Sequence, residues 1–226
     1  MNYTCIIPAR GGSKRIPRKN LQEVGGIPLI GHVIKNALAS NIFDQIYVST
    51  DSDEIARIAI DFGAEAPDRR SANLSDDHTP TRPVIADFIE NRPELDNDAS
   101  VIACIYPFAI FTNPRLIHLA KDSFEKLHDK SKYLVAIQKY SHPAQRAFTL
   151  TSSGYLSPLS PQYIEVRTQD LVESYHDAGQ FYFAKSSTWR SDKSVLANAY
   201  GLLIPKYSAV DIDDLEDLEY LRNLYK

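Results

Sequence analysis

The stretch Cys5-Ile6-Ile7-Pro8-Ala9-Arg10-Gly11-Gly12-Ser13-Lys14 places a short apolar run directly before a glycine-containing basic loop. The loop extends to Asn20, and its cations are Arg10, Lys14, Arg15, Arg18 and Lys19. The next helical pattern begins only at Pro28. This order of strand, flexible loop and helix is how α/β proteins hold anionic ligands at the carboxyl end of a strand. It predicts a first sheet strand followed by an anion-binding loop, with a merely solvated basic loop as the alternative.

Glycine and positive charge have separate roles in such a loop. Gly11 and Gly12 let the backbone approach a phosphate closely, because no Cβ stands in the way. The clustered cations neutralise charge that backbone N–H groups alone offset only in part. The loop matches neither a Walker A sequence nor the Gly-x-Gly-x-x-Gly dinucleotide fingerprint, so those two motif classes do not account for it.

Length, composition and net charge limit the structural and functional classes to which this protein can belong. The 226 residues suit a single α/β domain over 1–226, and a hydrophobic content of 43% is enough for a full core. The net charge of −4 argues against general binding of nucleic acid or of anionic membranes. Cys5 and Cys104 lie in apolar runs and are expected to be buried thiols. No signal peptide or membrane-length apolar run is recognisable, so we expect a cytoplasmic protein.

Apolar periodicity alternates between strand and helix along the chain. Strands are predicted at 45–49, 101–105, 133–138, 175–184 and 199–204, with a short last one at 209–213. Helices are predicted from Pro28, from about Asp53, over 81–91, from Pro114 and after Asp214. The early strand–helix–strand–helix order implies parallel strands with right-handed crossovers. We therefore predict a Rossmann-like, mostly parallel α/β sheet with helices on both faces.

Two predicted helices carry apolar stripes that are expected to face the core. In the first, which Pro28 opens, the stripe is Leu29, Ile30, Val33, Ile34, Ala37 and Leu38. In the last, which Asp214 caps, it is Leu215, Leu218, Leu221 and Tyr225.

Residues 142–170 break this alternation. Helical periodicity disappears, and Phe148-Thr149-Leu150, Gly154, Pro158 and Pro161 suggest short strands or hairpins. We interpret the segment as a small excursion from the sheet. A surface hairpin and a contact with another subunit both fit the pattern.

Asp211-Ile212-Asp213 forms a second polar constellation. Side chains two residues apart in a strand point the same way, so the two carboxylates converge while Ile212 turns into the core. Mg²⁺ prefers oxygen ligands and is commonly bound by one or two carboxylates together with the phosphates of the substrate. The alternative is that both aspartates merely precede a helix, a role that Asp214 and Asp217 serve better.

A basic loop and an Asp-x-Asp pair together indicate nucleotidyl transfer from a nucleoside triphosphate. That chemistry needs positioning and charge stabilisation more than a covalent catalyst. Arg10, Lys19 and a metal ion held by Asp211 are the predicted catalytic groups. The scattered histidines show no zinc-ligand spacing.

Further motifs resemble those of the CMP-sialic-acid synthetases, the acylneuraminate cytidylyltransferase family. The matching segments are Ile7–Lys14, Lys19-Asn20, Val48–Asp51, Arg70-x-x-x-Leu74, Asp77-x-Thr79 and Asp211–Asp213, in the family's order. The resemblance implies a nucleotide-diphospho-sugar transferase fold and a homodimer whose 142–170 excursion reaches the partner's site. It implies CTP binding by Ala9, Arg10, Gly12, Ser13, Lys19, Asn20, Arg70, Thr79 and Thr81, and Mg²⁺ binding by Asp211 and Asp213.

The segments that would bind the acceptor sugar resemble the pseudaminic acid branch of that family. They are Arg167–Leu171 and Tyr175–Tyr182, and the sugar-binding residues implied are Tyr106, Arg167, Asp177, Gln180 and Tyr182. Arg167 could pair with the sugar carboxylate in a bidentate fork. Residues 106–111, Tyr-Pro-Phe-Ala-Ile-Phe, depart from the family pattern and lack its threonine hydroxyl.

Several functional hypotheses therefore stand beside one another. The first is Mg²⁺-dependent formation of CMP-pseudaminic acid from CTP and the free sugar acid. The second is the same reaction with legionaminic or N-acetylneuraminic acid, and the altered 106–111 segment leaves that choice open. The third is a nucleotide-binding module without catalysis. A flavodoxin-like regulatory domain rests on fold alone and is the weakest.

Overall fold

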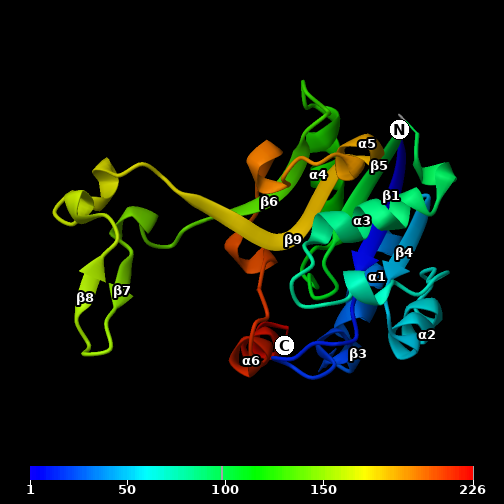
Figure 1. Ribbon diagram of the computed structural model, residues 1–226, viewed down its shortest axis with the longest axis horizontal. Helices are drawn as coiled ribbons and strands as arrows, with labels where there is room; N and C mark the ends of the chain where they lie inside the picture. Colours follow the sequence, from blue (N-terminus) through cyan, green and yellow to red (C-terminus); the bar gives the residue numbers. More distant parts are fainter. Residues whose placement is uncertain (98, 226) are drawn as a thin grey trace.

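The computed structural model describes residues 1–97 and 99–225 and is built around a central mixed sheet (Figure 1). Within these residues the sheet has six strands, in the order β10-β6-β9-β5-β1-β4. They are β1 (Asn2–Pro8), β4 (Gln45–Ser49), β5 (Ser100–Ile105), β6 (Tyr133–Lys139), β9 (Tyr175–Lys185) and β10 (Ala199–Leu203). Strand β9 is antiparallel to β5 and β6, and the other pairings are parallel. The predicted mostly parallel α/β sheet is confirmed.

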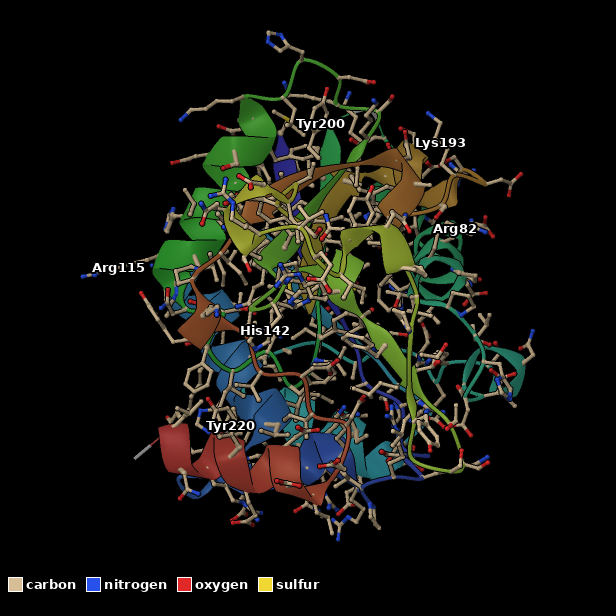
Figure 2. The ribbon with its side chains drawn as sticks, turned by 90° about the vertical axis from the view of Figure 1, so that its left-hand side faces the viewer. Arg82, Arg115, His142, Lys193, Tyr200 and Tyr220 are labelled. Atoms are coloured by element: carbon tan, nitrogen blue, oxygen red, sulfur yellow. The ribbon has the colours of Figure 1, made fainter. Side chains whose placement is uncertain are left out.

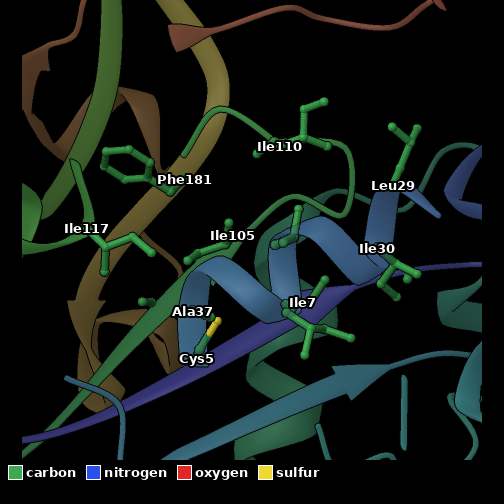
Figure 3. Packing of buried hydrophobic residues seen from close by; sticks show 14 of the residues in the cluster. Cys5, Ile7, Leu29, Ile30, Ala37, Ile105, Ile110, Ile117 and Phe181 are labelled. Carbon is green, nitrogen blue, oxygen red and sulfur yellow. The ribbon is translucent and has the colours of Figure 1, made fainter. Parts of the chain in front are cut away.

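Helices cover both faces of the sheet. They are α1 (Leu29–Ser40), α2 (Asp53–Asp61), α3 (Thr81–Glu90), α4 (Pro114–Glu125), α5 (Ser186–Arg190) and α6 (Leu215–Leu224). Cys5 and Ile7 of β1 share a hydrophobic cluster with α1, and Figure 3 shows Cys5 next to Ala37. Ile6, whose side chain points the other way, belongs to the cluster under α3 and α5. In the part of the chain that the structure describes, no helix is long and apolar enough to cross a membrane.

Side-chain caps begin three of the helices where the sequence predicts. Ser52 caps α2, and Asn113 Oδ1 accepts a hydrogen bond from the Leu116 N–H of α4 at 3.0 Å. Asp214 caps α6 and forms a reciprocal capping box with Asp217. These bonds satisfy donors that the first turn of a helix leaves unpaired, which fixes the helix starts.

The predicted start of the first helix is wrong. Pro28 is not helical but ends strand β3 (Ile27–Pro28), which pairs with β2 (Glu23–Val24). Gly25 and Gly26 connect the two strands with φ angles of 57° and 75°, a left-handed conformation that glycine adopts without a Cβ clash. Pro28 therefore belongs to the small hairpin, and α1 begins one residue later, at Leu29.

The predicted apolar stripes are confirmed except near helix ends. Leu38 and Leu215 are 42% and 61% exposed, so the prediction that they face the core is wrong. Leu38 follows buried Ala37 by one residue, a rotation of about 100° that turns it away from the core. Tyr225 is half-exposed and packs the edge of its ring on His32, with centroids 4.8 Å apart.

The predicted last strand at 209–213 is also wrong. The chain leaves the sheet after Leu203, passes through a 3-10 turn at Lys206–Ser208 and continues without strand pairing. Gln138 Nε2 donates to the carbonyl oxygens of Pro205 and Lys206 at 2.9 and 3.1 Å, which ties this departing segment to β6. Alternating burial persists all the same, since Ile212 is fully buried between two exposed aspartates.

The 142–170 segment forms the predicted hairpin. Strands β7 (Phe148–Leu150) and β8 (Leu156–Pro158) pair in antiparallel register and project far from the sheet (Figure 1). Apolar side chains are exposed on and beside this hairpin: Phe148, Leu150, Tyr155, Leu156 and Leu159. A role in dimerisation stays a prediction.

Trp189 of α5 is the anchor of the core on the α3 side. It is fully buried, its Nε1–H donates to the Ile102 carbonyl at 3.1 Å, and its ring meets Tyr133 edge to face. We expect Trp189→Ala to lower the free energy of unfolding by about 3–5 kcal/mol in urea titrations followed by circular dichroism. Leu215→Ala, at an exposed site, should change it by less than about 0.5 kcal/mol. Equal effects of the two changes would contradict this account of the core.

Candidate active site

A cavity of about 460 Å³ opens beyond the carboxyl ends of β1 and β5, and we call it the main cavity. It lies at the sheet edge where open α/β proteins bind ligands. Its lining residues are Pro8, Arg10, Ser13, Lys14, Arg15, Lys19, Asn20, Arg70, Asp77, Thr79, Thr81, Val84, Tyr106, Pro107, Phe108, Ile212 and Asp213. The structure thus brings together most of the predicted nucleotide-binding residues. Ala9 and Gly12 belong to the same loop, where Ala9 is fully buried.

The basic loop is held against the start of α2. The Gly11 N–H donates to Asp51 Oδ1 at 2.7 Å, and Asn20 Nδ2 donates to the Arg10 carbonyl at 2.9 Å. A Cβ on Gly11 would stand 3.0 Å from the Cβ of Ser52, so the close approach favours glycine here. The loop is therefore braced from both ends before any ligand binds.

An acidic side chain links the cations of the loop. Asp77 forms ion pairs with Arg10 and Lys14, each at 2.5 Å, and their hydrogen bonds hold its carboxyl pKa below the usual range. Arg15 pairs with Asp213 at 2.8 Å across the cavity mouth. These carboxylates keep the cations directed at the cavity, where an anionic ligand would compete for the same donors.

Lys19 stands deeper than the other cations. Its ammonium lies 4.0 Å from the centroid of the Phe108 ring, and burial lowers its pKa, although Asp211 and Asp213 act against that shift. Although Asp211 is exposed, neighbouring atoms partly desolvate its carboxylate and raise its pKa, with the like charge of Asp213 adding to the effect. Lys19 and the two aspartates therefore form one coupled charge cluster in which the carboxylates repel each other.

This cluster suits Mg²⁺. Both carboxylates point away from the core because Ile212 is buried between them. No group of three or more acidic, histidine or cysteine side chains gathers as a metal cage among residues 1–97 and 99–225. A carboxylate pair that leaves room for phosphate oxygens and water is how Mg²⁺ is usually held. Binding a divalent cation would also remove the repulsion that raises the pKa of Asp211.

Arg70 also lines the main cavity. Its Nη2 donates to the Ser49 carbonyl at the end of β4 at 3.1 Å, and burial lowers its pKa. Thr79 is held by Asp76, whose Oδ1 accepts from the Thr79 hydroxyl at 2.8 Å. A desolvated guanidinium and fixed hydroxyls offer the directional contacts that reading a nucleobase requires.

A second cavity of about 360 Å³, the side cavity, adjoins the first. Its lining residues are Pro80, Thr81, Arg82, Pro83, Tyr106, Asp177, Tyr182, Ser194, Val195 and Leu196. Thr81 and Tyr106 line both cavities, and their hydroxyl oxygens lie 2.7 Å apart. Sequence reasoning found Tyr106, Asp177 and Tyr182 but missed Arg82 and Ser194–Leu196. Arg82 Nη1 donates to the Ser191 carbonyl at 2.8 Å, which places it beside the turn carrying Lys193 (Figure 2). That contact spans 109 positions, and no local pattern signals it.

Two predicted sugar-binding residues lie outside both cavities. Gln180 is 1% exposed, and its amide donates to the carbonyl oxygens of Ala178 and Gly179. Arg167 is exposed on the excursion and pairs with Asp170 at 2.8 Å. Their sugar-binding roles stay predictions, and Arg167 could meet a ligand only beyond this chain's own cavities.

Fold and cavity together define an α/β protein that offers a cation-lined ligand cavity at the carboxyl ends of its sheet strands. A solved structure of CMP:2-keto-3-deoxy-manno-octonic acid synthetase complexed with CTP has the same fold, with a TM-score of 0.69 at 17% identity. The similarity covers 99% of this chain and 98% of that one. A family model described as cytidylyltransferase matches residues 4–186. The chain belongs to the cytidylyltransferase family.

Two characterised proteins are similar to this chain over all or nearly all of its length. A pseudaminic acid cytidylyltransferase of Campylobacter jejuni subsp. jejuni is 38% identical over 227 residues, covering 100% of this chain and 97% of the relative. A CMP-N,N'-diacetyllegionaminic acid synthase of Legionella pneumophila subsp. pneumophila is 31% identical, covering 94% of this chain and 91% of the relative. The family identified from the loop motif is thereby confirmed.

Proposed function

We propose that this protein transfers CMP from CTP to a nonulosonic acid, with pseudaminic acid as the acceptor, and releases pyrophosphate. The observation that carries the proposal is the pair of adjoining cavities that share Thr81 and Tyr106. The cation-lined main cavity suits a triphosphate, and the side cavity, which both polar and apolar side chains line, suits an acylated sugar. Full-length similarity to a pseudaminic acid cytidylyltransferase supports this choice of acceptor.

In this proposal the basic loop holds the triphosphate and leaves the α-phosphorus facing the side cavity. Arg10, Ser13 and Lys14 contact phosphate oxygens, and Arg70 with Thr79 orients the cytidine. The acceptor oxygen attacks the α-phosphorus, and the bond to the pyrophosphate oxygen breaks. Catalysis then rests on alignment and on fixed positive charge, because charge builds on the phosphoryl and leaving oxygens in the transition state.

Asp211 and Asp213 are the residues that would hold Mg²⁺. When bound, Mg²⁺ supplies Lewis-acid stabilisation of the phosphoryl oxygens. Lys19 adds a partly desolvated positive charge at the same place, where electrostatic interactions are stronger than in water. We also propose that the protein acts as a cytoplasmic homodimer, in which the projecting hairpin brings Arg167 to the sugar carboxylate of the partner's site. The exposed apolar side chains of the hairpin support this arrangement.

Legionaminic acid is the second candidate acceptor. The 31% identity to a CMP-N,N'-diacetyllegionaminic acid synthase favours it, as does the unusual 106–111 segment at the wall between the cavities.

Pyrophosphate release from CTP and Mg²⁺, measured with a panel of sugar acids, tests the proposal. We expect turnover with pseudaminic acid at a kcat/KM at least tenfold above that for legionaminic and N-acetylneuraminic acids, and background release when the acid is omitted. Substituting ATP, GTP or UTP for CTP controls for the nucleotide. A higher kcat/KM for legionaminic acid would move the assignment to that acceptor. Absence of turnover with all three acids would refute the function.

A further inference from the structure

The Phe108 ring contacts both the basic loop and the wall that the two cavities share. It is half-buried, lines the main cavity and is nearly parallel to the Tyr106 ring, with centroids 5.4 Å apart and planes inclined by 7°. The Lys19 ammonium lies 4.0 Å from the centroid of the Phe108 ring. Phe108 thus connects a cation of the basic loop with Tyr106, whose side chain lines both cavities.

The backbone around Phe108 fixes the position of this ring. The Tyr106 N–H donates to the Gln180 carbonyl of β9 at 2.9 Å, and the Ala109 N–H donates back to the Tyr106 carbonyl at 3.0 Å. Ala109 is fully buried and Ile110 nearly so, which anchors the turn in the hydrophobic core. The packed fold therefore holds the ring in place before a ligand binds.

Lys19 differs from the other cations of the basic loop in what stabilises its charge. Each of the others pairs with a carboxylate: Arg10 and Lys14 with Asp77, Arg15 with Asp213, and Arg18 with Glu54. Within residues 1–97 and 99–225, the Lys19 ammonium forms no ion pair of this kind and lies over the Phe108 ring instead.

This difference affects how each cation can bind phosphate. A cation that is paired with a carboxylate has committed N–H donors, so a phosphate must displace the carboxylate before it can use them. The negative face of an aromatic ring attracts a cation without forming the strong hydrogen bonds of a carboxylate, so the three donors of Lys19 stay available. Burial lowers the pKa of Lys19, which means that the site disfavours its charged form, and the ring offsets part of that cost.

We infer that Phe108 is the positioning residue for Lys19: its ring holds the ammonium in the main cavity with its donors free for the oxygens of the departing pyrophosphate. The inference rests on the proposed function. Charge builds on those oxygens as their bond to the α-phosphorus breaks, so an ammonium already in place stabilises the transition state more than it stabilises bound CTP. The contact lies in residues 106–111, the segment that departs from the family pattern, so the resemblance does not account for it.

Replacement of the ring tests this role. Phe108→Leu removes the ring and keeps an apolar side chain, and Phe108→Tyr keeps the ring. At saturating CTP, Mg²⁺ and the best sugar acid of the panel, Phe108→Leu should lower the single-turnover rate of pyrophosphate release about 10-fold, the range for a partly desolvated cation–π contact. The CTP concentration that gives half the maximal rate should stay within about threefold of wild type. Phe108→Tyr should keep the rate within about twofold of wild type.

A double-mutant cycle separates the positioning of Lys19 from a general effect on the cavity wall. The ammonium is absent in the Lys19→Met background, so Phe108→Leu should change the rate there by less than about twofold. A ring that only excluded water or contacted CTP would give the same loss in both backgrounds. Phe108→Met also lacks a ring, and it should repeat the loss if Phe108→Leu does not fold.

Phe62→Leu is the matched control, because it removes a ring from beneath the Lys35 ammonium, outside both cavities. This variant should keep the wild-type rate, and circular dichroism should show that each variant is folded. Equal losses in the two backgrounds, or a Phe108→Leu rate within about twofold of wild type, would overturn the inference while the proposed function stands. A wild type that turns over none of the sugar acids would overturn both.

Discussion

Asp211→Asn should lower the rate of CMP transfer at least about 1,000-fold at saturating CTP and Mg²⁺. Asparagine keeps the shape of the side chain but removes the charge that would hold the cation. Lewis-acid stabilisation of this kind contributes several kcal/mol to phosphoryl-type transition states, and each 1.36 kcal/mol is a tenfold change in rate. The measurement is pyrophosphate release under single-turnover conditions, with Mg²⁺ varied to test whether higher concentrations restore the rate.

The same variant should fold as well as the wild type or better. Partial desolvation and the neighbouring Asp213 raise the pKa of Asp211, so its ionised form is disfavoured by folding. Whenever Asp211 is ionised, the wild type carries this cost, which Asn does not. Urea midpoints should therefore be equal or higher for the variant. Asp61→Asn, at an exposed carboxylate of α2 outside both cavities, should leave both the midpoint and the rate close to wild type. Full activity of Asp211→Asn would remove Asp211 from the metal assignment.

Lys19→Met should lower the transfer rate by about 100- to 1,000-fold. Methionine retains an apolar contact with Phe108, so the change removes mainly the positive charge next to Asp211 and Asp213. A preorganised charge in a partly desolvated site typically accounts for about 2.7–4 kcal/mol of transition-state stabilisation. We expect the loss in kcat to exceed the rise in KM for CTP, because charge accumulates on the leaving pyrophosphate only during the reaction.

Stability and a matched lysine separate that effect from misfolding. Burial lowers the pKa of Lys19, so its charged form costs stability that methionine does not. Lys19→Met should accordingly unfold at the same or a higher urea concentration than wild type. Lys35→Met makes the same change at a lysine of α1 whose ammonium lies over the Phe62 ring, outside both cavities. This variant should leave the rate unchanged. Equal loss of rate in the two variants would show that Lys19 has no special role.

Local features of the sequence were sufficient for most of the fold. Alternating and periodic apolar residues predicted the sheet strands and the helix faces, and Asp214 was predicted as the cap of the last helix. The predictions fail where contacts with residues outside the local segment determine its secondary structure. Pro28 pairs with Glu23 across a glycine turn instead of opening a helix, and residues 209–213 run extended without a strand to pair with.

The basic loop, the family and the Asp211–Asp213 carboxylate pair can be identified from contiguous residues, because their chemistry does not depend on distant neighbours. Which residues share a cavity wall depends on how distant segments pack together. Thr81 and Tyr106 are 25 positions apart and Arg82 and Ser191 are 109 apart, yet each pair is in hydrogen-bond contact. Parallel strands with long crossovers bring such residues to one edge of the sheet, and Tyr182 lies beside Cys104 only because β9 pairs with β5. Desolvation, which sets the pKa directions of Lys19 and Asp211, likewise depends on the packed fold.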